Sequence, residues 1–216
     1  MSKISLEPNA SGAGTFTLAA PNSNTNRTLT LPDASGSIVA ADASTGRFDS
    51  SNMPAGSVLQ VQTFQTDAIS TQSIAAGARA QVANVDIDIT PFSTNSTFLI
   101  HVSCMFEMDP DKIWDTMFSL FRNGVEIGAS NTENRTGGIQ APARSFTAEN
   151  ADDTPVSVAF HFTDQPNTTN TVNYALNFKN GRDSSIVLAV NRGISDRDAT
   201  RSERGMTILT VMEIAG

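Results

Sequence analysis

The segment that most constrains the fold is residues 116–128, in which two β-favouring runs meet at Asn123-Gly124. Both central residues of a two-residue type I′ turn need a positive φ, and Asn and Gly adopt it at low cost. The sequence therefore predicts a tight β-hairpin at this point. Because side chains alternate along a strand, Phe118 and Leu120 are expected on one face, opposite Met117, Ser119 and Phe121.

The most apolar run of the chain, residues 96–108, is expected to lie next to this hairpin in a buried sheet. No window shows the 3.6-residue periodicity of a helix. The other predicted strands are residues 57–66, 80–90, 144–148, 156–162, 172–178, 185–191 and 206–214. About ten short strands joined by loops rich in Asn, Asp, Gly and Ser predict an antiparallel β-sandwich or jelly roll over residues 57–216. The nearly all-apolar strand 185–191 is expected at the centre of a sheet or against a partner.

Residues 1–50 differ from the rest of the chain. They hold three short β-like pieces, at residues 15–20, 27–31 and 37–41, and too few apolar side chains to close a core of their own. We therefore expect residues 1–50 to pack as a β segment against other copies of the chain or against another protein. Residues 51–56 are predicted to be a linker, and residues 57–216 a separate head domain.

Composition excludes several classes of protein. A net charge of −8 argues against nucleic-acid binding, because phosphates require a basic surface. No segment approaches the ~20 apolar residues that a membrane span needs, and the N-terminus lacks the apolar core of a signal peptide. We therefore expect synthesis in the cytoplasm, without membrane insertion. The single cysteine, Cys104, stands in the middle of an apolar strand and is expected to be buried.

The residues that enzymes use do not form a recognisable pattern. His101 and His161 fall in separate predicted strands, without the spacing of a metal-binding pair. No nucleophile motif occurs, and nothing singles out a pair of carboxylates. The sequence therefore predicts no catalytic residue, no metal ligand and no cofactor, and hence no enzyme.

The most distinctive loop is residues 109–115, which holds three aspartates and the only tryptophan between two core strands. One hypothesis is that Trp114 stacks on a sugar ring while Asp111 or Asp115 binds its hydroxyls. The alternative is that Trp114 covers the end of the sandwich or packs at a subunit contact. The charged loop 195–205 also has two interpretations: ion pairs between subunits or a recognition tip, and a plain solvated loop.

Three stretches resemble short structural proteins of tailed bacteriophages, common in marine and cyanobacterial phages and described as tail-fibre proteins. They are TFTLAAPNSNTNRTLTLPDASGSIVAAD at residues 15–42, MPAGSVLQVQTFQTD at residues 53–67, and FSLFRNGVEIG at residues 118–128 together with residues 184–216. The resemblance implies a C-terminal jelly roll similar to tumour necrosis factor-like domains, a homotrimer, and a place in the virion. It transfers no catalytic residue.

These expectations converge on a structural virion protein. The leading hypothesis is a short trimeric fibre or spike whose head contacts a host-surface glycan or protein, with the N-terminal segment interwoven or docked on other virion proteins. The alternative is a capsid or tail decoration protein with a purely structural role. A glycan-degrading spike is disfavoured by the short length of the chain and the missing catalytic signature.

Overall fold

The computed structural model describes residues 10–15, 17, 19, 22–28, 30, 33, 35, 53–108, 114–129, 135–142, 154–200 and 202–216. Contacts between residues divide the chain into a unit of residues 1–38 and a unit of residues 39–216. The described residues of the first unit form turns and irregular backbone, and the amide of Thr25 donates to Ser23 Oγ at 3.1 Å.

The β pieces expected near the N-terminus are only partly covered by the described residues. The described residues of 15–20 and 27–31 are not in strands. Phe16, Leu18, Leu29 and Leu31, which carry the apolar character of these two pieces, lie outside the described residues, as does the whole of 37–41. Pairing of these pieces therefore remains a prediction.

The second unit is built from β-strands. The described residues contain ten strands and no helix: β1 (Val58–Thr66), β2 (Ser70–Ile74), β3 (Arg79–Ile89), β4 (Thr97–Met108), β5 (Thr116–Arg122), β6 (Val125–Ile127), β7 (Val156–Asp164), β8 (Val172–Asn180), β9 (Ile186–Val190) and β10 (Thr207–Ile214). All the strand pairings are antiparallel, so the predicted all-β antiparallel architecture is confirmed.

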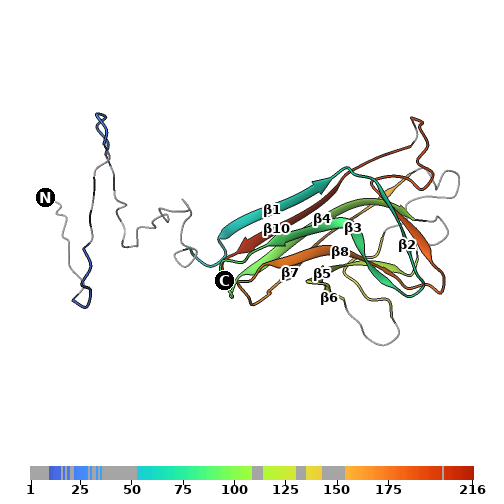
Figure 1. Cartoon of the computed structure of the whole chain (residues 1–216), viewed down its shortest axis with the longest axis horizontal. Coiled ribbons are helices and arrows are strands. Elements are labelled where there is room, and N and C mark those ends of the chain that lie inside the picture. Colours follow the sequence, from blue (N-terminus) through green and yellow to red (C-terminus); the bar gives the residue numbers. More distant parts are fainter. Residues whose placement is uncertain are drawn as a thin grey trace. The chain divides into compact units, whose positions relative to one another are not determined.

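The first sheet is organised around β4. Along one edge, β10 pairs with residues 97–103 of β4 and β9 pairs with residues 106–108, so β9 and β10 follow each other end to end. Next to them, β1 pairs with β10 and β2 pairs with β9. The other edge of β4 pairs with β7. The order across this sheet is therefore β7, β4, β9 with β10, and β2 with β1 (Figure 1).

The second sheet has the order β3-β8-β5-β6 and contains the predicted hairpin. Arg122 pairs with Val125, which leaves Asn123 and Gly124 as the two turn residues. Their φ angles are 50° and 78°, so the prediction of a turn with two positive φ values is confirmed. Phe118 and Leu120 are both fully buried in the core.

The expectation that residues 96–108 pair with this hairpin is wrong. Both edges of β4 are occupied by other strands, and the hairpin strand β5 pairs instead with β8. The two segments meet across the core, where the rings of Phe106 and Phe118 lie 4.8 Å apart. An apolar run shows that a strand is central, but it does not show which strand occupies its edges.

The core lies between the two sheets, and Cys104 lies in it as predicted. The strand β9 is central in its sheet, which confirms one of the two expectations for residues 185–191. Ile186, Leu188, Ala189 and Val190 are buried by their own chain, at 2 % exposure or less. The apolar character of this strand is thus explained within one chain and does not call for a second subunit.

Two features differ from the expected strands. The strand β2 is not predicted from the sequence, because Ser70-Thr71-Gln72-Ser73 lacks apolar alternation. It forms because β9 supplies the backbone hydrogen bonds along its length. The strand β3 is interrupted between Gln81 and Asp86, where Asn84 has a φ of 59°. The strand expected at residues 144–148 lies outside the described residues.

Candidate functional site

The proposed sugar-binding loop is described only in part. Asp111 lies outside the described residues, whereas Trp114 and Asp115 form the turn that leads into β5. Trp114 is 46 % exposed, and the Arg182 guanidinium carbon lies 4.9 Å from the centre of its ring. This cation–π contact with the turn after β8 could not be foreseen from the sequence.

Gly181 connects the turn before β5 to the turn after β8. The Asp115 carbonyl, on a residue with a φ of 60°, accepts a hydrogen bond from the Gly181 amide at 2.7 Å. A Cβ atom at Gly181 would lie 2.1 Å from Thr136 Oγ1 and 2.6 Å from the Asp115 carbonyl oxygen. Only glycine fits this position, so the backbone beneath Trp114 is closely packed.

Trp114 lies at the end of the sandwich opposite the point where the chain enters it. The register pairs Val58 and Thr97 with Ile214, so β1 begins and β10 ends at the same end of the sheet. The strand β4 runs from that end for 12 residues, a length of about 40 Å, before the chain reaches Trp114. Figure 1 shows the C-terminus beside the start of β1.

The charged loop between β9 and β10 forms ion pairs within one chain. Arg204 donates to both carboxylate oxygens of Asp196, at 3.0 and 2.9 Å, and Arg192 lies 3.5 Å from the same carboxylate. The hydrogen bond from Arg204 holds the pKa of Asp196 below its usual range. Asp196 thus finds its ion-pair partners, Arg204 and Arg192, within its own chain.

The outward side of the first sheet carries no Asp, Glu, Lys or Arg over three consecutive cross-strand rows. Every side chain in these rows is exposed or partly exposed, and Val61 is 53 % exposed. We call this set of residues the outer face. Its rows are Val61–Met212–Leu99–Thr163, Thr63–Thr210–His101–His161 and Gln65–Ile208–Ser103–Ala159.

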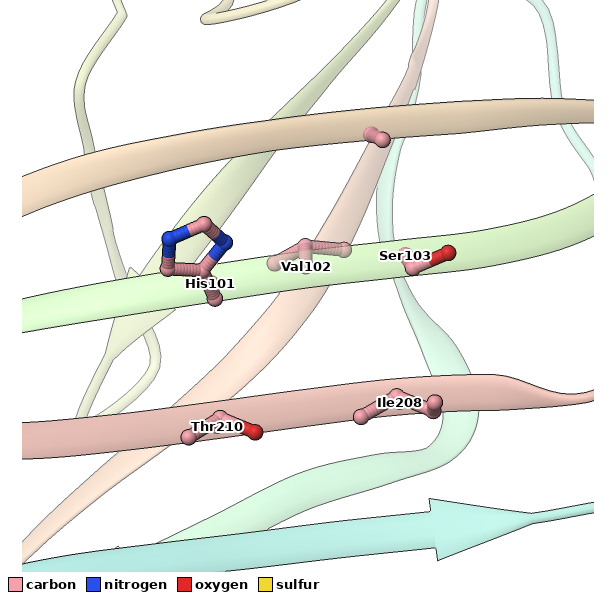
Figure 2. A pocket seen from close by; sticks show the side chains of 6 residues that line it. His101, Val102, Ser103, Ile208 and Thr210 are labelled. Atoms are coloured by element: carbon pink, nitrogen blue, oxygen red, sulfur yellow. The ribbon is translucent and has the colours of Figure 1, made fainter.

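The two histidines of the chain meet on the outer face. His101 of β4 and His161 of β7 are directly opposite in the strand register, and their ring centres are 5.7 Å apart. Figure 2 shows the His101 ring on the β7 side of β4. His101 lines a hollow of about 330 Å³ together with Ser103, Thr210 and Ile208. Sequence analysis missed this pair, because spacing along the chain does not show which strands are neighbours.

The described residues offer little enzyme chemistry. Within them, no group of three or more His, Cys, Asp or Glu side chains could hold a metal ion. Burial raises the pKa of the Cys104 thiol to about 11, so it is protonated and unreactive at neutral pH. In the same part of the chain, no helix is long and apolar enough to cross a membrane.

A comparison of the sequence with protein-family models and with curated proteins finds no match.

Proposed function

We propose that this chain is a structural, non-enzymatic component of a tailed bacteriophage virion, a short trimeric fibre or spike whose C-terminal head contacts the host surface. The observation that carries the proposal is the uncharged outer face. Copies of a chain with a net charge of −8 repel one another, and a face without charged side chains adds no like-charge pairs where two copies meet. Such a face suits the interior of a homo-oligomer.

The apolar side chains of β10 add to this argument. Ile208 and Met212 alternate with the buried residues Leu209 and Val211, so β10 presents apolar side chains on both of its faces. One face is covered by the chain's own core. The other is partly exposed in a single chain, and burying it against another copy would remove apolar surface from water.

The order of strands supports the assignment of the head as a jelly roll. We count β1 with β2, and β9 with β10, as single strands because each pair lies end to end. In chain order, the first sheet then contains strands one, eight, three and six, and the second contains strands two, seven, four and five. An eight-stranded, two-sheet arrangement of this kind is typical of a jelly roll. The number of three subunits rests on the resemblance to phage fibre proteins.

The direction of the chain supports a spike with a proximal and a distal end. The N-terminal segment enters the sandwich beside the C-terminus, whereas Trp114 lies at the opposite end. If the end of the sandwich at which β1 begins faces the virion, Trp114 lies at the distal end of the head. Trp114 then presents an exposed ring, packed against the partly buried Arg182, of the kind that stacks on sugar rings.

Analytical ultracentrifugation of the full-length protein tests the assembly. We expect three times the chain mass of 22.9 kDa for the wild type. Ile208→Glu, which places a charge on the outer face, should give a smaller species that remains folded. Thr169→Glu, in the loop between β7 and β8, serves as the control and should leave the mass unchanged. A monomeric wild type would contradict the proposal.

A glycan array probed with the wild type and Trp114→Ala tests host contact. We expect binding by the wild type and loss of binding by a Trp114→Ala protein that keeps the wild-type mass. Assembly without glycan or cell binding would favour the alternative, a capsid or tail decoration protein. Release of reducing sugar from a bound polysaccharide would contradict the non-enzymatic role.

A further inference from the structure

The two histidines on the outer face have a second property besides their lack of formal charge. His101 and His161 are the only histidines of the chain, both are exposed, and the strand register places them side by side. Their imidazole rings are 5.7 Å apart between centres and inclined by 36°. Two imidazoles that rise from the same side of neighbouring strands can act on one ligand together.

This spacing is close to that of two imidazoles on a single metal ion. A transition-metal ion lies about 2.0–2.1 Å from each ligating nitrogen, so two rings on a tetrahedral ion have centres about 5 Å apart. The observed separation of 5.7 Å between the ring centres is close to this value. The strand β4 is hydrogen-bonded to β10 on one side and β7 on the other at this row, so the backbone is already held in place.

The surroundings indicate which kind of cation fits. The adjoining hollow of about 330 Å³ has room for metal-bound water, and the Ser103 and Thr210 hydroxyl groups line it. The three rows of the outer face hold no Lys or Arg to repel a cation. They also hold no Asp or Glu, so the hard oxygen ligands that Ca²⁺ and Mg²⁺ prefer are missing from these rows.

We propose that His101 and His161 form a two-histidine site for a divalent transition-metal ion of the zinc, nickel and copper class, with water completing the coordination shell. Both ligands come from one chain and lie on the outer face, so the site requires that this row stays open to solvent in the proposed assembly. Binding links β4 to β7, which is the edge strand of the first sheet, and thereby stabilises the folded state in proportion to metal occupancy.

The test uses the full-length protein without a polyhistidine tag, since a tag would bind the same ions. Isothermal titration with Ni²⁺ or Zn²⁺ at slightly alkaline pH should show one ion per chain. His101→Gln and His161→Gln should each weaken binding by at least tenfold, by analogy with the effect of removing supporting groups at metal sites. Gln65→Ala, on the same face but outside the lining of the hollow, serves as the matched control and should bind as the wild type does.

Two further measurements separate this site from accidental surface binding. Electron paramagnetic resonance of bound Cu²⁺ should show two imidazole nitrogens in the wild type and one in His161→Gln. The ion should raise the melting temperature of the wild type and of Gln65→Ala, but not that of either histidine variant, whereas Ca²⁺ should have no effect. Binding that survives both histidine substitutions, or a Cu²⁺ spectrum with a single imidazole nitrogen in the wild type, would overturn the proposal.

Discussion

Arg122 Nη1 donates to both carboxylate oxygens of Asp164, at 2.9 and 3.0 Å. Arg122 ends β5 in one sheet and Asp164 ends β7 in the other, so this ion pair joins the two layers of the sandwich. The phenol of Tyr174, on β8, donates to the same carboxylate at 2.7 Å. The carboxylate of Asp164 is therefore the centre of a polar link between the two sheets.

We predict that Arg122→Met and Asp164→Asn each lower the free energy of unfolding by about 1–3 kcal/mol, because each leaves a partly buried partner without its charge-assisted bond. In urea unfolding, the double variant should lose less than the sum of the single losses, since both substitutions remove the same interaction. Arg204→Met breaks an exposed ion pair and should change stability little. Strictly additive losses of unfolding free energy in the double variant would contradict a direct interaction between Arg122 and Asp164.

Tyr174 is the only tyrosine, so its ionisation can be followed by the ultraviolet absorbance of tyrosinate. Burial, and then the hydrogen bond to Asp164, raise its pKa far above the usual value. An unfolded tyrosine ionises near pH 10. The stabilising contribution of the protonated phenol is therefore complete below about pH 10 and decreases as the pH rises further, because only the unfolded state releases the proton.

In an alkaline titration we consequently expect the tyrosinate signal to appear together with the loss of β-sheet circular dichroism. In Asp164→Asn the signal should appear at lower pH. Ionisation near pH 10 in the fully folded wild type would show that the phenol is not held as the structure describes.

Cys104 should react with thiol reagents only after unfolding. Its side chain is fully buried and its sulfur lies 3.4 Å from Thr207 Oγ1, while burial raises the thiol pKa to about 11. At pH 8 this leaves about two orders of magnitude less thiolate than a free cysteine has. We expect the native protein to react at least about a hundredfold more slowly than the protein in concentrated urea. Equal rates would mean that the core around Cys104 opens readily.

Substitution of Glu213 should lower the stability of the fold more than substitution of most other polar residues. It is fully buried, and its carboxylate accepts hydrogen bonds from Ser96 Oγ at 2.6 Å, the Phe92 amide at 2.7 Å and Gln60 Nε2 at 2.5 Å. Glu213→Ala leaves these donors without their acceptor and should cost about 2–4 kcal/mol in urea unfolding. Glu203→Ala, at an exposed position, provides the comparison and should cost little.

Asn191 should be required for the junction between β9 and β10. Its side-chain amide donates to the carbonyls of Thr66 and Ala68 at 3.1 and 3.0 Å, and Thr207 Oγ1 donates to its side-chain oxygen at 2.8 Å. We expect Asn191→Ala to lower stability by about 2–4 kcal/mol. The backbone φ of 60° adds strain for alanine, so Asn191→Gly should be the milder change, by about 1 kcal/mol. Equal stability of the two variants would exclude the backbone contribution.

Much of the fold was predictable from local patterns. The hairpin followed from Asn123-Gly124, because the turn type depends on the φ preferences of two adjacent residues. The strands β1, β4, β7, β8 and β10 and the burial of Cys104 followed from alternating or continuous apolar side chains. The strand β2 was not predictable, because its polar residues give no such pattern and its partner β9 lies more than a hundred residues further along the chain.

The candidate sites were less predictable. Trp114 was recognised as unusual from composition, but its contact with Arg182 depends on where the turn after β8 lies. His101 and His161 were assessed as isolated residues, because their separation along the chain has no relation to metal-ligand spacing. Their placement on outward positions of two strands was inferable from alternation. Their adjacency was not.

The sequence by itself determined the all-β class, the position of most strands and the tight turn, since these depend on periods of two residues and on local backbone preferences. Only the tertiary structure decided which strands pair, that the apolar run of β4 faces the hairpin across the core, and that two histidines share a row on an uncharged face. The physical reason is that strand pairing uses the same backbone hydrogen bonds at every position. Partner choice therefore depends on how all the strands pack together at once, which no single segment specifies.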